Sequence, residues 1–238
     1  MIRVSVILCC YNGERFIRQA LQSAYRQTLS QDQYEVLFVN DGSTDATAEI
    51  ARAFHGYRHF RYLENSRNAG LPASCNRGLE AAQGDYVIRL DADDTFEPSL
   101  LEACCVELDR GVTDLVYSDR FEHSAGSSQS TVRSLETFNL YDLIAIGTMM
   151  RRQLLMDIGG YRDTFWEEYD VYIRYLLRSQ KLPHRIPRPL LTYVLRPGSM
   201  TSDPGRVKAG WEDLKKLWPE ETLRQFGELP AVASEQVP

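Results

Sequence analysis

Residues 86–94 read YVIRLDADD, a mostly apolar run followed by three carboxylates within four positions. Carboxylates this close repel one another and hydrate strongly, so they rarely end a buried strand without a counter-charge. A divalent cation such as Mg²⁺ or Mn²⁺ takes oxygen ligands and commonly shares them with a substrate phosphate. The alternative is a solvated acidic turn before a helix that begins near Pro98. The elements around this stretch decide between the two interpretations.

Three strand–helix units precede the acidic stretch. The apolar runs at residues 4–10 and 34–39 are continuous, which predicts strands buried on both faces of a mainly parallel sheet. Three helices and one short strand are expected at residues 14–27, 45–54, 72–83 and 60–63. Strand–helix alternation implies right-handed crossovers, and therefore an α/β fold with a doubly wound sheet and helices on both faces.

Polar residues follow three of these strands where each one ends. Tyr11 and Asn12 follow the first strand, Asp41 the second, and residues 91–94 the fourth. Ligands of doubly wound sheets bind outside the carboxyl ends of the strands, which favours a metal–phosphate site over a solvated turn at residues 91–94. The stretch around Asp41 is also consistent with a simple turn and helix cap. No glycine-rich phosphate loop is present, so phosphate binding would depend on the metal.

The second half of the chain shows less regular patterns. A helix is expected at residues 98–110 and a strand at 115–118, and the small polar residues 123–130 indicate a mobile loop. The remaining segments are expected as helices at 138–146, 151–158, 166–179 and 207–217, and as strands at 148–150 and 190–195.

Acidic residues gather at the start of the helix expected at 166–179. Glu167, Glu168 and Asp170 could complement the helix dipole, and Asp170 with Arg174 would form an i,i+4 pair worth a few tenths of a kcal/mol. The glycine- and aromatic-rich approach to this helix, residues 159–166, favours a second interpretation. A carboxylate there could act as a general base for a sugar hydroxyl, worth roughly 10²–10⁴ in rate.

Bulk composition excludes several classes of protein. The 238 residues suit one α/β domain, and a net charge of −6 argues against a nucleic-acid binder and against polybasic membrane attachment. No apolar run approaches the roughly 20 residues that cross a bilayer. The chain enters a strand pattern at once, which predicts no signal peptide. Five cysteines without metal or redox spacing indicate a reducing cytoplasm, and the four histidines show no ligand spacing.

Residues 4–201 resemble the family 2 glycosyltransferases of the GT-A fold, inverting enzymes that use nucleotide sugars. The resemblance is carried by VSVI and YN at the start, NDGSTD at 40–45, NAG at 68–70, NRG at 76–78, DADD at 91–94, and GGY at 159–161 followed by EEYD at 167–170. It implies that Asp93, with Asp91 nearby, serves a divalent metal, Mn²⁺ or Mg²⁺. It also implies a set of residues that bind the nucleotide sugar: Tyr11, Asn12, Glu14, Asp41, Asn68, Asn76, Asp91, Ala92 and Arg196.

The chain departs from the family pattern at two positions that matter for chemistry. Glu168 occupies the place of the usual aspartate base, and we expect it to be the base with Glu167 as the reserve. Arg196 stands where a histidine is common. An arginine cannot ligate a metal but can pair with a diphosphate, so a looser or altered metal dependence is expected.

The resemblance implies a division of the chain and a reaction. We expect a nucleotide-sugar-binding half at residues 1–110, a smaller acceptor-binding half at 111–227 and a flexible tail at 228–238. The expected reaction moves a sugar from a UDP-sugar to a hydroxyl of a carbohydrate or lipid-linked saccharide, in cell-surface polysaccharide or glycolipid synthesis. The expected location is the cytoplasm, including the inner membrane face. The alternatives are a sugar nucleotidyltransferase, although its basic first loop is missing, and a non-catalytic sugar-binding module.

Overall fold

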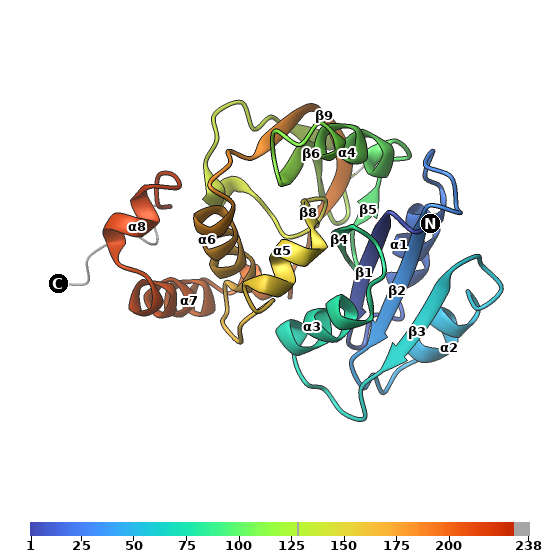
Figure 1. Cartoon of the computed structure of the whole chain (residues 1–238). Coiled ribbons are helices and arrows are strands. Elements are labelled where there is room, and N and C mark those ends of the chain that lie inside the picture. The colour runs from blue at the N-terminus through green and yellow to red at the C-terminus, as the bar shows by residue number, and fades with distance from the viewer. Residues whose placement is uncertain (128, 231–238) are drawn as a thin grey trace.

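The computed structural model describes residues 1–127 and 129–230 (Figure 1). Its sheet runs in the order β3-β2-β1-β4-β8-β6-β9-β5, with β7 paired to β6 outside this path. Four parallel strands form one half: β1 (Val4–Cys10), β2 (Tyr34–Asn40), β3 (Phe60–Glu64) and β4 (Tyr86–Asp91). The predicted α/β fold, doubly wound with a parallel first half, is confirmed.

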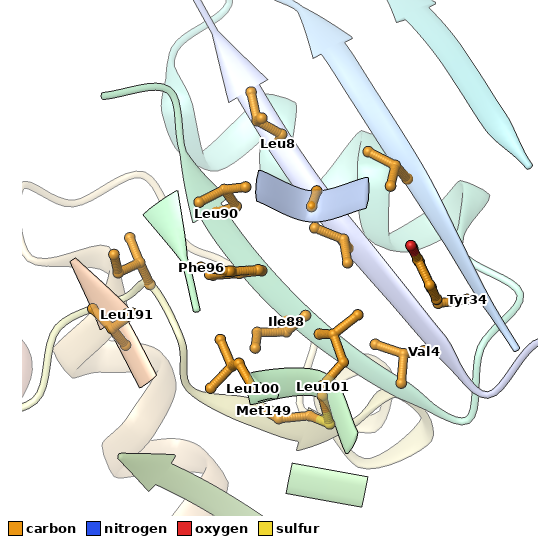
Figure 2. Packing of buried hydrophobic residues seen from close by; sticks show 14 of the residues in the cluster. Val4, Leu8, Tyr34, Ile88, Leu90, Phe96, Leu100, Leu101, Met149 and Leu191 are labelled. Atoms are coloured by element: carbon orange, nitrogen blue, oxygen red, sulfur yellow. The ribbon is translucent and has the colours of Figure 1, made fainter. Parts of the chain in front are cut away.

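Helices cover both faces of this parallel half because its central strands β1, β2 and β4 are buried along almost their whole length. β1 is buried throughout, and its alternate residues enter two different cores. Val4 and Leu8 pack on one face with α1 (Ile17–Tyr25) and α4 (Leu100–Asp109), as Figure 2 shows. Ile7 packs on the other face with α3 (Leu71–Ala81). α2 (Thr47–Arg52) follows β2.

The strand register brings the three predicted polar turns to one edge. Cys10 of β1 lies opposite Asn40 of β2, and Cys9 lies opposite Asp91 of β4. The residues that follow these three strands therefore begin at the same edge of the sheet.

Beyond β4 the sheet becomes mixed. β8 (Met149–Arg151) lies antiparallel between β4 and β6 (Leu115–Ser124), and β9 (His184–Leu195) runs parallel to β6. β5 (Thr95–Phe96) closes the edge, antiparallel to β9. Four helices belong to this half: α5 (Arg152–Asp157), α6 (Glu167–Ser179), α7 (Pro204–Leu217) and α8 (Glu220–Arg224).

Several predictions for the second half are wrong. Residues 138–146 contain only a 3₁₀ turn, η1 (Leu140–Asp142). At its start the Asn139 side chain accepts a hydrogen bond from the Tyr141 N–H. Leu140, Leu143 and Ile146 lie in a mostly irregular segment, and all three side chains are buried. Their helix-like spacing therefore reflects burial and not an α-helix. The loop predicted at 123–130 is shorter than expected, because β6 continues to Ser124 and pairs with β7 (Ser130–Arg133), while residues 125–127 and 129 remain outside the strands.

Other differences concern boundaries. β9 begins at His184, six residues earlier than expected, because the added residues pair with β6. α7 begins at Pro204, where Asp203 accepts hydrogen bonds from two backbone N–H groups. β5 and α8 were not predicted, and most of the expected tail at 228–238 lies outside the described residues. None of the described helices is long and apolar enough to cross a membrane.

Candidate active site

The turns after β1 and β2 are held together by side chains that bond each other's backbone. The Asn12 carboxamide oxygen accepts from the Thr44 N–H at 2.8 Å, and the Gly13 N–H donates to the Thr47 hydroxyl at 2.8 Å. The Glu14 carboxylate accepts from the Ala46 N–H at 2.9 Å, and the Glu14 N–H donates back to Asp45 at 3.1 Å. These contacts fix the turn that presents Tyr11, whose side chain is half exposed.

Each carboxylate of the acidic stretch contacts a different part of the molecule. Asp91 is bound by both arms of Arg89, with Nε–Oδ1 at 2.6 Å and Nη2–Oδ2 at 3.0 Å. Asp93 accepts from Arg196 Nε at 2.5 Å, and the Arg196 guanidinium lies 4.8 Å from the centre of the Phe16 ring. The stretch is therefore neither a solvated turn nor a bare carboxylate cluster.

Asp94 has a different environment from its two neighbours. It is buried, and it accepts the Val194 N–H at 2.7 Å, which ties the acidic turn to β9. Burial, followed by the nearby charges of Asp91 and Asp93, raises the pKa of Asp94 to about 9. The hydrogen bond from Val194 lets Asp94 position the segment that carries Arg196.

The start of α6 brings two further carboxyls to the same place. Glu167 is buried and pairs with Arg89 Nη1 at 2.7 Å. Glu168 makes no side-chain hydrogen bond to any described residue. Burial and then the neighbouring Glu167 charge raise its pKa well above the usual range of a glutamate, with Arg89 acting in the opposite direction. Glu168 is thus a half-buried carboxyl whose side chain has no hydrogen-bond partner among the described residues.

A cavity of about 570 Å³ joins these groups. It is lined by eight of the predicted site residues: Tyr11, Asn12, Asp91, Ala92, Asp93, Glu167, Glu168 and Arg196. Phe16 and Leu71 line the side of the parallel strands, and Phe165, Trp166 and Tyr169 form an aromatic wall on the α6 side. The cavity crosses from one half of the fold to the other.

Four predicted site residues do not line this cavity. Glu14 braces the neighbouring turn, as described above. Asp41 is buried and accepts three hydrogen bonds from the loop before α3: Asn65 Nδ2 at 2.7 Å, Ala69 N–H at 2.8 Å and Gly70 N–H at 3.0 Å. Its carboxylate holds that loop, which leaves little capacity for a nucleobase.

Asn68 and Asn76 are also occupied by backbone groups. The Asn68 oxygen accepts the Gly70 N–H at 3.0 Å. Asn76 donates to the Tyr161 carbonyl at 2.7 Å and accepts the Tyr161 N–H at 2.8 Å. The expected sugar contact of Asn76 is not supported by this position, because the amide clamps the loop that leads to α6.

The residues present fit a divalent cation that arrives with a phosphate ligand. Acidic side chains outnumber basic ones among the described residues of the cavity wall: Asp91, Asp93, Asp94, Asp142, Glu167 and Glu168 face Arg89, Arg120 and Arg196. A diphosphate brought next to Asp91 and Asp93 is favoured by an accompanying cation. No group of three or more metal-binding side chains occurs in the described part of the chain. Mg²⁺ commonly uses one or two carboxylates and completes its shell with substrate phosphates, so Asp93 and Asp91 suffice.

Two buried cations of the cavity wall, Arg89 and Arg120, were not among the predicted site residues. The signal for Arg89 was a charge inside an otherwise apolar strand. Asp170 and Arg174 contribute more than the predicted i,i+4 pair. Asp170 is fully buried, bonds Arg174 Nε at 2.8 Å and accepts Trp218 Nε1 at 3.0 Å. Arg174 in turn donates to the Gly160 carbonyl at 2.6 Å, so the pair anchors the loop before α6.

Comparisons with known proteins agree with this geometry. The family model described as Glycosyl transferase family 2 matches residues 5–181. A cholesterol galactosyltransferase of Borreliella burgdorferi is 35% identical over 116 residues, which cover 49% of this chain and 32% of that protein. The chain spans about a third of the length of the first curated relatives it matches.

Two solved structures share the fold at low identity. TarS of S. aureus, residues 1–349 in complex with UDP-GlcNAc, superposes with a TM-score of 0.75 at 18% identity, covering 94% of this chain and 71% of that one. A mannosyltransferase of Pyrobaculum calidifontis, PcManGT, in complex with GDP-Man and Mn²⁺, gives a TM-score of 0.72 at 17% identity, covering 97% and 66%. The fold is therefore that of GT-A glycosyltransferases.

Proposed function

Because the chain belongs to glycosyl transferase family 2 and is a glycosyltransferase, we propose that it moves a sugar from a nucleotide-diphosphate donor to an acceptor hydroxyl with inversion at the anomeric carbon. The observation that carries the proposal is one cavity lined both by an acidic stretch paired with arginines and by a half-buried Glu168 without a side-chain partner among the described residues. The first group suits a diphosphate and the second suits proton abstraction.

The donor occupies the end of the cavity near β1 and β4. Tyr11 and Asn12 approach the nucleoside, and Arg196 exchanges part of its contact with Asp93 for the diphosphate, since a guanidinium matches phosphate oxygens. A UDP-sugar is the proposed donor, supported by the UDP-GlcNAc complex of the fold neighbour. Asp93, with Asp91, would hold Mn²⁺ or Mg²⁺, which supplies electrostatic stabilisation to the departing diphosphate. The Mn²⁺ in the mannosyltransferase complex supports the metal.

Glu168 serves as the general base rather than Glu167. Glu167 is committed to a buried ion pair with Arg89, whereas Glu168 lines the cavity without a side-chain partner among the described residues. In the proposed step, Glu168 takes the hydroxyl proton while the acceptor oxygen forms its bond to the anomeric carbon. The bond from that carbon to the phosphate oxygen breaks on the opposite face, and the nucleoside diphosphate leaves with the electron pair.

The acceptor approaches along the aromatic wall of Phe165, Trp166 and Tyr169. A carbohydrate or lipid-linked saccharide suits such a wall, because sugar rings present apolar faces to aromatic rings. The curated name of the cholesterol galactosyltransferase supports a lipid-borne acceptor as one form of this class. Synthesis of a cell-surface polysaccharide or glycolipid on the cytoplasmic side remains our prediction.

The test incubates the protein with a panel of UDP-, GDP- and dTDP-sugars and Mn²⁺, with mono- and disaccharide acceptors, and measures the nucleoside diphosphate released. We expect release from a UDP-sugar, its loss in Asp93→Asn, and donor binding without turnover in Glu168→Gln. Pyrophosphate release from a nucleoside triphosphate and a sugar phosphate would instead identify a nucleotidyltransferase. Tight donor binding without release by the wild-type protein would identify a binding module. Either result overturns the proposal.

A further inference from the structure

Arg89 lies at the junction of the two halves of the cavity. It extends from β4 and is only 7% exposed, yet its guanidinium contacts two carboxylates from segments 76 residues apart, Asp91 and Glu167. Nε and Nη2 bind Asp91, and Nη1 binds Glu167 at 2.7 Å. The three side chains form a continuous bridge from the donor side to the start of α6.

The main effect of the bridge is to fix the relative positions of Asp91 and Glu167, and its contribution to stability is secondary. A buried ion pair gains little net stability over well-packed apolar residues, because desolvation opposes the Coulomb attraction. The planar fork of arginine, however, binds one carboxylate through two parallel bonds and still has an arm for another. Arg89 therefore fixes the orientation of Asp91 and the position of the first residue of α6 with the same rigid group.

This position matters because Glu167 and Glu168 are consecutive in the first turn of α6. The Glu167 side chain is tied to β4, so the backbone that carries Glu168 cannot shift without breaking the bond to Arg89. Neither α5 nor η1 provides a described side-chain bond to Glu168. Other side chains, such as Tyr172 through the Ile144 carbonyl, hold the rest of α6. The bond from Arg89 to Glu167 joins the first turn of α6 to the acidic stretch.

We propose that Arg89 is a positioning residue for glycosyl transfer: through Asp91 and Glu167 it holds the donor-binding carboxylates and the Glu168 base at a fixed separation. The inference rests on the proposed function and deepens it. Arg89 touches neither reacting atom in this scheme and acts through its two partners. Glu167 is accordingly the link to the base rather than a second base.

The main test measures kcat and equilibrium UDP binding in the presence of Mn²⁺. Lysine at position 89 keeps the charge but cannot bind both carboxylates in this way, and we expect Arg89→Lys to lower kcat roughly 10²-fold. Glu167→Ala should lower kcat to a similar extent while leaving UDP binding within about threefold of wild type. The kcat of the double variant, Arg89→Lys with Glu167→Ala, should lie within about threefold of the kcat of the less active single variant, because both changes break the same bridge.

Two matched variants separate positioning from general loss of structure. Arg151→Lys changes another strand arginine, whose Nε bonds Asp114 at 2.7 Å outside the cavity. It should keep kcat even where thermal stability falls. Glu167→Gln keeps an oxygen that can accept the Arg89 N–H and should restore most of the kcat lost in Glu167→Ala.

The pH profile of kcat adds a readout that a folding defect does not move. The charges around Glu168 are Glu167, Arg89 and Asp91, and the Glu167 charge raises its pKa. Glu167→Gln should therefore move the acid limb of the profile to lower pH. Three results would overturn the inference while transfer by the wild type stands. The first is an unchanged kcat in Arg89→Lys, and the second is a loss of kcat in the double variant equal to the product of the two single losses. The third is an acid limb of the pH profile that does not move in Glu167→Gln. Absence of any transfer by the wild type would overturn the proposed function itself.

Discussion

The turns after β1 and β2 on the donor side and helix α6 on the acceptor side are held by different kinds of contact. On the donor side, side chains bond backbone groups of adjacent turns, as Asn12 does with Thr44 and Asp41 does with Gly70. On the acceptor side, buried arginines bond carboxylates, as in the Arg89–Glu167 and Arg174–Asp170 pairs. The two sides also differ in their sheet, which is parallel up to β4 and mixed beyond it (Figure 1).

This difference predicts different responses to mutation. A capping or turn hydrogen bond contributes roughly 0.5–2 kcal/mol, and its loss leaves a backbone group that water can reach. Removal of one partner from a buried ion pair leaves an uncompensated charge and costs about 3–5 kcal/mol. Substitutions on the acceptor side should therefore damage the protein more than substitutions of the donor-side turns.

Glu168→Gln is expected to have the largest effect, and it is an exception to this pattern because Glu168 has no ion-pair partner within residues 1–127 and 129–230. Loss of a general base should lower kcat by roughly 10²–10⁴, with no loss of thermal stability. Steady-state kinetics and a melting curve measure the two quantities. Full activity in this variant would move the base elsewhere.

The same residue predicts the pH dependence of transfer. Burial, then the Glu167 charge, raises the pKa of Glu168 above its usual range. A base must be deprotonated, so kcat should rise as pH increases through this raised pKa, and the acid limb should lie above the ordinary titration range of a glutamate. A profile that is flat down to pH 5 would contradict the environment described for Glu168.

Asp170→Asn should have the next largest effect and tests the buried ion pairs directly. It leaves the Arg174 guanidinium, which is 8% exposed, without its carboxylate, and should lower the free energy of unfolding by about 3–5 kcal/mol. The matched control is Glu220→Gln, which removes an exposed i,i+4 partner of Arg224 and should cost less than about 0.5 kcal/mol. If chemical denaturation shows the same loss of unfolding free energy for both variants, buried and exposed ion pairs do not differ as predicted.

Asn76→Ala tests a contact that crosses between the two sides. It removes two hydrogen bonds to the Tyr161 backbone and should destabilise the protein by about 1–3 kcal/mol. Because Tyr161 belongs to the loop before α6, KM for the acceptor should rise while UDP binding is retained. A selective loss of UDP binding would instead restore the predicted nucleotide contact of Asn76.

Asp45→Ala should have the smallest effect. Burial is the largest single influence on the pKa of Asp45 and raises it, but hydrogen bonds from the Thr47 side chain, the Thr47 N–H and the Glu14 N–H together outweigh burial and lower the pKa. Loss of this cap-like contact should cost about 1 kcal/mol at neutral pH. Because the folded-state pKa is depressed, the contribution is present above the unfolded-state pKa and fades as pH falls through the folded-state value. The difference between wild type and variant in urea unfolding should therefore shrink in acid.

The sequence predicted the donor side better than the acceptor side for a physical reason. Strands buried on both faces, such as β1 and β2, are continuous apolar runs, and their spacing with helices determines a parallel sheet. The acceptor side depends on pairings between distant segments. Asp170 and Arg174 were predicted only as an i,i+4 pair, because nothing nearby in the sequence shows that Trp218 bonds Asp170 and that the Gly160 carbonyl accepts from Arg174.

The candidate site divides in the same way. The acidic stretch and the α6 carboxylates were predicted from local clusters, and the structure brings them to one cavity. The roles of Asp41 and Asn76 could not be separated from ligand binding, because a polar side chain that bonds the backbone looks the same in sequence as one that binds a substrate. The bridging role of Arg89 depends on Glu167, 78 residues later in the chain.

A crystal structure of the Glu168→Gln variant with a UDP-sugar and Mn²⁺ tests the central claim most directly. We predict an anomalous Mn²⁺ signal beside Asp93, the diphosphate against Arg196, and the anomeric carbon facing position 168 with Glu167 still bonded to Arg89. A nucleotide bound outside the cavity, or a donor sugar that faces Glu167 instead of position 168, would contradict the account.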